Sequence, residues 1–168
     1  FFGRDALIAE LLRGIGRGQR LIALVGASGS GKSSVVRAGL VPALAKGAID
    51  GSDHWLVASM VPGAHPFAEL EAALLRSTLD APSSLAVQLD DGDAGLVRAA
   101  LRLLPDDSAR LVVISDQFEE LFTLVDDPVV RDRFLSNLVA AVDDPHGRIT
   151  VLVTLRADFY ALPLAHPE

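Results

Sequence analysis

Residues 26–33 read GASGSGKS and lie between two patterns of regular secondary structure. An apolar run, residues 21–25, precedes the segment, and a helical pattern begins at Lys32. The segment fits G-x-x-x-x-G-K-[ST] at every fixed position, and its glycines allow a tight turn between a strand and a helix. Such a turn points successive main-chain N–H groups, and the positive end of the helix, toward one spot. The sequence therefore predicts a phosphate-binding loop at the junction of a strand and a helix.

The predicted loop supplies most of the candidate nucleotide contacts. Lys32 is expected to bridge the β- and γ-phosphates, and the Ser33 hydroxyl is expected to coordinate Mg²⁺. The chain contains 13 arginines but only two lysines, and one of the two lysines stands at this position. The candidate cofactor-binding residues in and beside the loop are Gly26, Ala27, Ser28, Gly29, Ser30, Gly31, Lys32, Ser33 and Ser34.

The rest of the chain alternates between strand and helix patterns. Asp5 is a candidate N-cap for the first helix, and the first strand, residues 21–25, has the composition of a strand buried on both faces. In one of the later helices, Leu101 and Leu104 are expected to face inward with Leu96. Further strands are expected at residues 55–61, 110–115 and 149–154, and helices at about 67–74, 96–104 and 129–142. A helix is also expected from residue 32 to about 45, and Gly39 and Pro42 should kink or shorten it. This alternation predicts a mostly parallel sheet with helices on both faces.

Acidic residues follow the third predicted strand. Asp116 comes directly after residues 111–115 and is the candidate carboxylate for a magnesium site together with Ser33. Glu119 and Glu120 lie close enough to the strand end to polarise an attacking water, and the sequence favours neither over the other. One of the two glutamates could instead be an acid that the helix dipole favours at a helix start.

An arginine follows the fourth predicted strand. Ligands of open α/β sheets bind outside the carboxyl ends of the strands, so Arg156 is a candidate for bidentate contact with a γ-phosphate. The alternative is an ion pair between Arg156 and the nearby Asp158. Lys32, Asp116, Glu119, Glu120 and Arg156 are thus the candidate catalytic residues.

Composition excludes several classes of function. The 168 residues match one domain, and a formal net charge of −7 opposes binding to nucleic acid through its phosphates. The absence of cysteine excludes disulfides, thiol nucleophiles and cysteine-bound metals, and it fits a cytoplasmic location. The longest apolar runs fall far short of the roughly 18 residues that a membrane helix needs.

These motifs together resemble the nucleotide-binding domain of the STAND class of signal-transduction ATPases, in the branch called novel STAND NTPases, which is related to NACHT and AAA+ proteins. The segment Phe2-Gly3-Arg4-Asp5 resembles the motif that lies beside the adenine in this class. Residues 26–44 are similar to its Walker A loop and following helix, and residues 116–121 to its extended Walker B motif. Thr154-Leu155-Arg156 resembles its sensor segment, with Arg156 at the phosphate-sensing position.

The resemblance implies a P-loop NTPase fold of the additional-strand type, a three-layer α/β sandwich with the fourth strand inserted between the first and third. It also implies that residues 1–168 are one nucleotide-binding domain of a larger multidomain protein, ending before a fifth strand. Proteins of this class couple ATP/ADP exchange and slow hydrolysis, with Mg²⁺, to self-association and signalling. An N-terminal effector and C-terminal sensor repeats are the implied partners of the domain.

One departure from the related families concerns hydrolysis. Gln117 stands directly after Asp116, where AAA+ relatives carry a catalytic Glu, so slow turnover is expected. Two alternatives to a regulatory ATPase switch remain open from the sequence. The first is a P-loop kinase that transfers a phosphate to a small molecule, and the second is a nucleotide-binding interaction module that does not hydrolyse its ligand.

Overall fold

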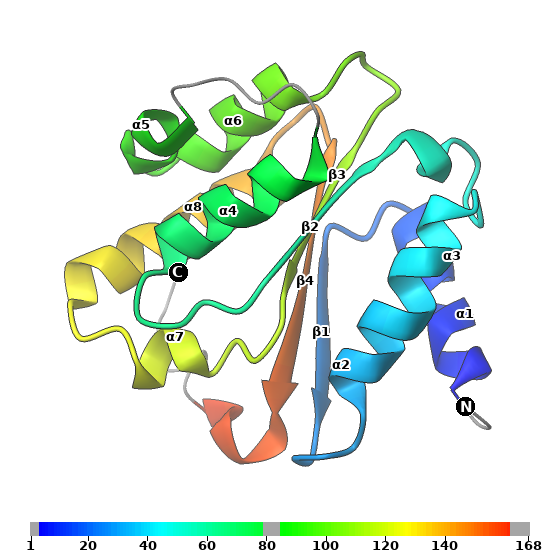
Figure 1. Cartoon of the computed structure of the whole chain (residues 1–168), viewed down its shortest axis with the longest axis horizontal. Helices are drawn as coiled ribbons and strands as arrows, with labels where there is room; N and C mark the ends of the chain where they lie inside the picture. Colours follow the sequence, from blue (N-terminus) through cyan, green and yellow to red (C-terminus); the bar gives the residue numbers. More distant parts are fainter. Residues whose placement is uncertain (1–3, 79–84, 162–168) are drawn as a thin grey trace.

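A four-stranded parallel sheet organises the chain, and the computed structural model describes residues 4–78 and 85–161 around it. The strands are β1 (Leu21–Gly26), β2 (Leu56–Met60), β3 (Leu111–Ser115) and β4 (Ile149–Arg156), and their order in the sheet is β1-β4-β3-β2. The fourth strand therefore lies between the first and the third, as the resemblance implied. Figure 1 shows the sheet nearly edge-on, with the carboxyl ends of β1 and β4 at the bottom.

Helices cover both faces of the sheet, which confirms the expected three-layer α/β architecture (Figure 1). On one face lie α1 (Asp5–Gly16), α2 (Lys32–Val35) and α3 (Val41–Ala45), and on the other lie α4 (Pro66–Ser77), α5 (Leu85–Asp90), α6 (Gly95–Leu103) and α8 (Pro128–Asp143). The central strand β3 serves both layers: Val112 and Ile114 pack with the first group of helices, while Leu111 and Val113 pack with the second. Because both faces of β3 are covered, residues 111–114 are all apolar, and the polar Ser115 stands at the carboxyl end of the strand.

The register of the strands brings the predicted site segments to one edge. Gly26 at the end of β1 is opposite Arg156 at the end of β4. Ser115 at the end of β3 is opposite Val153 of β4 and Met60 of β2. The loop after β1, the acidic segment after β3 and the turn after β4 therefore leave the sheet side by side.

The helix expected at residues 32–45 is continuous but changes its winding. Between α2 and α3 lies a π-helical segment, η1 (Val36–Leu40), and Pro42 falls in the first turn of α3. Proline lacks an N–H, so it fits a first turn and not the interior of a helix. A Cβ atom at Gly39 would meet the Cδ1 atom of Ile8 at 2.3 Å, so this glycine allows α1 to approach closely.

Three expectations about individual positions were wrong. Asp5 is the first residue of α1 and does not cap it; Arg4 occupies the cap position, without a side-chain hydrogen bond to the helix. Strand β1 is not buried on both faces, because it is an edge strand in the described sheet and Leu21 is 58% exposed. Leu101 is 43% exposed, and Leu103 is buried in its place, because helix α6 is rotated from the orientation that the sequence pattern predicts.

Within the described ranges, no helix combines the length and the apolar character needed to cross a membrane.

Candidate functional site

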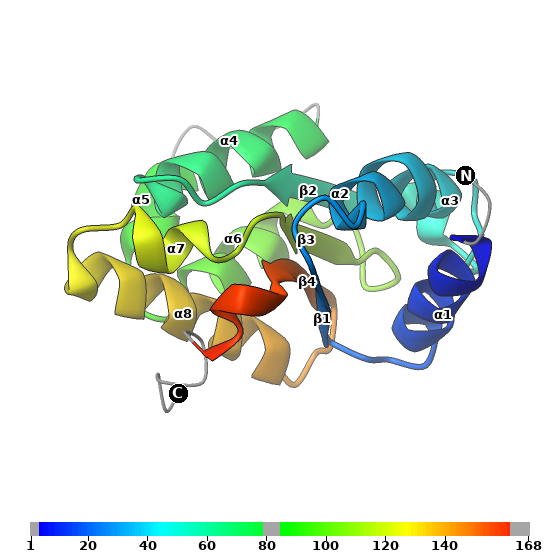
Figure 2. The ribbon, with the colours of Figure 1, turned by 90° about the horizontal axis from the view of Figure 1, so that it is seen from below.

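The glycine-rich loop joins β1 directly to α2 at the carboxyl edge of the sheet (Figures 1 and 2). Gly29 and Gly31 have φ angles of 72° and 84°, in the left-handed region that side chains with a Cβ atom avoid. The Ser30 N–H donates to the Ala27 carbonyl at 3.2 Å and closes the turn. Gly31 then occupies the cap position of α2, where the first N–H groups of a helix have no partner within the helix. Left-handed glycines followed by the N-terminus of a helix are features of phosphate-binding loops, and the assignment of this loop stays a prediction.

Lys32 lies on the loop that precedes it. Its Nζ atom donates to the Gly26 carbonyl at 2.7 Å and to the Ala27 carbonyl at 2.9 Å. The ammonium group is therefore held by two acceptors of the loop itself. Contact with a phosphate, as the sequence predicts, requires an exchange of these two hydrogen bonds.

Arg4 connects the start of α1 to the same loop. Its Nη1 atom donates to the Gly31 carbonyl at 3.1 Å and its Nη2 atom to the Ser30 carbonyl at 3.3 Å. Arg4, the residue before α1, thus contacts the loop, and its expected place near the nucleotide stays a prediction. Phe2 and Gly3 lie outside the described residues.

Asp116 is the most connected acid of the site and is almost fully buried. Its Oδ1 atom accepts hydrogen bonds from the Ser33 Oγ atom at 2.8 Å and from the Thr154 Oγ1 atom at 2.6 Å. Its Oδ2 atom forms an ion pair with the Nη2 atom of Arg37 at 2.9 Å. The carboxylate therefore joins the end of β3 to α2, to η1 and to β4.

The donor set suits a magnesium ion. Mg²⁺ binds oxygen ligands and commonly retains several waters, so one hydroxyl and one carboxylate are a sufficient protein contribution. The Ser33 hydroxyl directs its hydrogen to Asp116, which leaves the lone pairs of its oxygen for a cation. Ser33 and Asp116, the two residues predicted as metal ligands, are already in contact across 83 residues of sequence.

No sequence motif indicates an individual role for Arg37 or Thr154. Thr154 is a buried polar residue in a strand that is otherwise mostly apolar. Because buried hydroxyls are almost always hydrogen-bonded, a partner for Thr154 is expected. Its Oγ1 atom also accepts a hydrogen bond from the Gln117 N–H at 3.0 Å. Arg37 lies four residues after Ser33, a spacing that puts the two side chains on one side of a helix.

The two glutamates after β3 occupy different environments. Glu119 is 6% exposed, and its Oε2 atom accepts a hydrogen bond from the Arg156 N–H at 3.3 Å. Glu120 is partly exposed and is the first residue of α7 (Glu120–Thr123), where a helix favours an acid. Gln117 has a φ angle of 55° and an exposed side chain. Of the two candidates for a base, Glu119 is the one that contacts the end of β4.

Arg156 adopts the alternative that the sequence left open. Its guanidinium forms an ion pair with Asp158, with 2.5 Å between Nη2 and Oδ2, and lies over the Phe159 ring at 5.0 Å from the ring centroid. The hydrogen bond from Arg156 lowers the pKa of Asp158, and the charge of Lys32 lowers it further. Asp158 thus lies within electrostatic reach of both cations. Arg156 must leave this carboxylate before its predicted contact with a phosphate can form.

Comparison with known proteins identifies the family and the fold of the chain. The family model described as Novel STAND NTPase 1 matches residues 1–168. Among solved structures, the Aeropyrum pernix ORC2 protein in ADPNP and ADP complexes is similar in fold, with a TM-score of 0.57 and 17% sequence identity. The match covers 98% of this chain and 43% of that chain, so the present chain spans less than half the length of the ORC2 protein. Among curated proteins, no relative matches the sequence.

Proposed function

Since the chain belongs to the novel STAND NTPase 1 family, we propose that it binds Mg-ATP and Mg-ADP at the glycine-rich loop and acts as a nucleotide-dependent regulatory switch. The observation that carries this proposal is the 2.8 Å hydrogen bond from Ser33 Oγ to Asp116 Oδ1. It joins the loop to the carboxylate after β3, so a phosphate site and a metal site share one edge of the sheet.

In this proposal the loop amides and Lys32 hold the phosphates, and Ser33 and Asp116 hold the metal. Bound Mg²⁺ supplies positive charge that neutralises the phosphate oxygens. Arg4 fixes the position of the loop through the Ser30 and Gly31 carbonyls. Residues 1–168 then act as one nucleotide-binding domain of a larger protein.

Slow hydrolysis is part of the proposal. Gln117, which cannot act as a base, follows Asp116, and the buried Glu119 carboxylate accepts from the main chain of Arg156. A site with this arrangement suits a switch whose nucleotide state shifts a conformational equilibrium. We propose that this equilibrium controls self-association and signalling of the full-length protein.

Thermal unfolding with and without nucleotide tests the binding step. Ligand at about one hundred times its dissociation constant stabilises a protein by roughly 2.7 kcal/mol. For a domain of this size that corresponds to a rise in Tm of roughly 5–10 °C. Lys32→Ala is expected to abolish the rise, because it removes the cation of the loop. Lys46→Ala is the matched control, since Lys46 is the other lysine of the chain and is exposed beyond α3.

The environment of the glutamates also favours a second candidate, a nucleotide-binding module that does not hydrolyse ATP, because Glu119 is 6% exposed. Measurement of phosphate release separates the two candidates: slow release that Glu119→Gln abolishes supports the ATPase switch.

Light scattering of the full-length protein in ATP and in ADP tests the coupling to assembly. A mass that is the same in both nucleotides would contradict the switch.

A further inference from the structure

Arg37 is the charged partner of the buried Asp116 carboxylate. It lies in η1, one helical turn beyond Ser33, and its Nη2 atom is 2.9 Å from Asp116 Oδ2. The other partners that the described residues give to this carboxylate, Ser33 and Thr154, are neutral hydroxyls. Arg37 therefore supplies the positive charge that compensates Asp116 in the absence of a metal.

The two side chains differ strongly in exposure. The Asp116 side chain is 2% exposed, whereas the Arg37 side chain is 57% exposed. A buried carboxylate without a compensating cation is costly, so the metal-free protein depends on the ion pair. The exposed arginine, in contrast, can leave the carboxylate and be hydrated with little loss of packing.

A magnesium ion at Ser33 and Asp116 adds two positive charges beside a carboxylate that Arg37 already neutralises. The guanidinium and the ion repel each other, and both are attracted to the same Asp116 carboxylate. Arg37 thus stabilises the metal-free state and opposes the metal-bound state.

We propose that Arg37 is a positioning residue that holds Asp116 in the metal-free protein, competes with Mg²⁺ for this carboxylate, and thereby sets the magnesium concentration that nucleotide binding requires. This inference rests on the proposed function of the site. The concentration of free Mg²⁺ at which nucleotide binds then depends on the charge of residue 37.

The test measures the free Mg²⁺ concentration that gives half-maximal binding of a fluorescent ATP analogue. Arg37→Gln is expected to lower this concentration by about tenfold, the order expected when a unit charge and a divalent ion no longer repel across one carboxylate in a water-like dielectric. Arg37→Lys, which retains the charge without the planar fork, is expected to lie between the wild type and Arg37→Gln. Arg102→Gln is the matched control, because Arg102 is an exposed arginine of α6 on the other face of the sheet.

A second readout is the melting temperature in EDTA without nucleotide. Arg37→Gln is expected to lower it, and saturating Mg²⁺ with nucleotide is expected to remove most of the difference from the wild type. A structural role alone would lower the melting temperature equally in both conditions and leave the magnesium requirement unchanged.

Either an unchanged or an increased magnesium requirement in Arg37→Gln would overturn the inference while leaving the proposed function intact. If Arg37→Gln does not fold, Arg37→Lys is compared with the wild type instead. A lower magnesium requirement in Arg37→Lys then supports the inference, and an unchanged or increased one overturns it. A wild-type chain that binds no analogue at any magnesium concentration would instead refute the proposed function, and the inference with it.

Discussion

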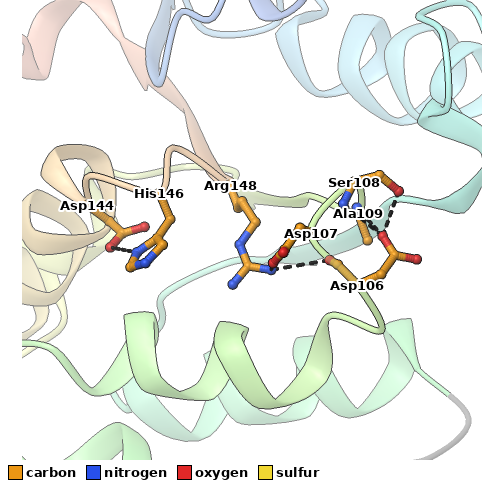
Figure 3. A network of polar contacts seen from close by, with 7 residues as sticks. All are labelled: Asp106, Asp107, Ser108, Ala109, Asp144, His146 and Arg148. Carbon is orange, nitrogen blue, oxygen red and sulfur yellow. Dashed lines mark hydrogen bonds and ion pairs between the residues drawn. The ribbon is translucent and has the colours of Figure 1, made fainter.

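The two ends of the sheet use polar side chains in different ways. At the carboxyl end, the buried Asp116 is bound by Ser33, Thr154 and Arg37, which come from other elements. At the amino end, Asp106 binds the nearby Ser108, and the exposed Asp107 pairs with Arg148. There, Arg148 contacts the Asp106 carbonyl and the Asp107 carboxylate, and His146 contacts Asp144 (Figure 3).

The polar residues at the amino end therefore stabilise the fold, whereas those at the carboxyl end can exchange their partners for a ligand. At the amino end, side chains satisfy main-chain groups near the end of α8 and in the turn before β3. At the carboxyl end, Lys32, Arg37 and Arg156 are cations, and each is bound by acceptors of the chain itself. In the proposed function a polyphosphate with its metal replaces those acceptors, so substitutions at this end are expected to change ligand binding. Substitutions at the other end are expected to change stability alone.

The largest effect is expected from Asp116→Asn. The amide keeps an oxygen for Ser33 and Thr154 but loses the negative charge that faces Arg37 and the metal. The Tm rise with nucleotide and Mg²⁺, roughly 5–10 °C in the wild type, should fall to the value measured in EDTA.

Asp107→Asn at the amino end is the matched control for Asp116→Asn, because the Asp107 side chain is fully exposed. It should retain the full rise in Tm with nucleotide and Mg²⁺. Loss of the rise in this control would break the distinction between the two ends.

Thr154→Val is expected to have the next largest effect. The change keeps the shape of the side chain but removes the hydroxyl that donates to Asp116 and accepts from the Gln117 N–H. The loss of these two hydrogen bonds, one of them to a buried carboxylate that retains its bond from Ser33, is expected to cost about 1–3 kcal/mol in the free energy of unfolding. Urea unfolding measures this loss, and nucleotide binding should weaken as well because Asp116 loses a fixed contact. Thr123→Val, in the last residue of α7, provides a comparison away from the carboxylate.

Arg20→Met is expected to cost roughly 1 kcal/mol of stability without weakening nucleotide binding. Arg20 donates to the Val142 and Asp144 carbonyls at the amino end, and methionine retains much of its apolar stem. Urea unfolding and titration with a fluorescent ATP analogue measure the two properties on the same sample. Weaker nucleotide binding in this variant would contradict the separation of roles.

The smallest effect is expected from Asp106→Asn, and it should depend on pH. Hydrogen bonds from the Ser108 side chain, then from the Ser108 and Ala109 N–H groups, lower the pKa of Asp106. A lowered pKa in the folded state means that the carboxylate stabilises the protein above its usual pKa, and that this contribution disappears as the pH falls through the folded-state pKa. The wild type should therefore be slightly more stable than the variant at pH 7, with the difference vanishing in acid. Urea midpoints across this range measure the difference, and one that grows toward low pH would contradict the assignment.

Local sequence patterns predicted the type and order of the helices and strands better than the burial of their individual side chains. The order of strands and helices follows from runs of apolar residues and from glycine and proline, and these act over a few neighbouring residues. The exposure of Leu21 and Leu101 could not be predicted in this way. It depends on which strand lies at the sheet edge and on how far α6 is rotated, and both depend on contacts between distant segments.

The sequence by itself determined the glycine-rich loop, because its glycines, Lys32 and Ser33 are adjacent in the chain and their conformational and chemical requirements are local. It also determined that Asp116 directly follows a buried strand, since residues 111–114 form a continuous apolar run. Only the tertiary structure decided that Arg37 and Thr154 bind this carboxylate, and that Glu119, and not Glu120, contacts the end of β4. Such pairings depend on strand order and side-chain direction, which no local pattern encodes.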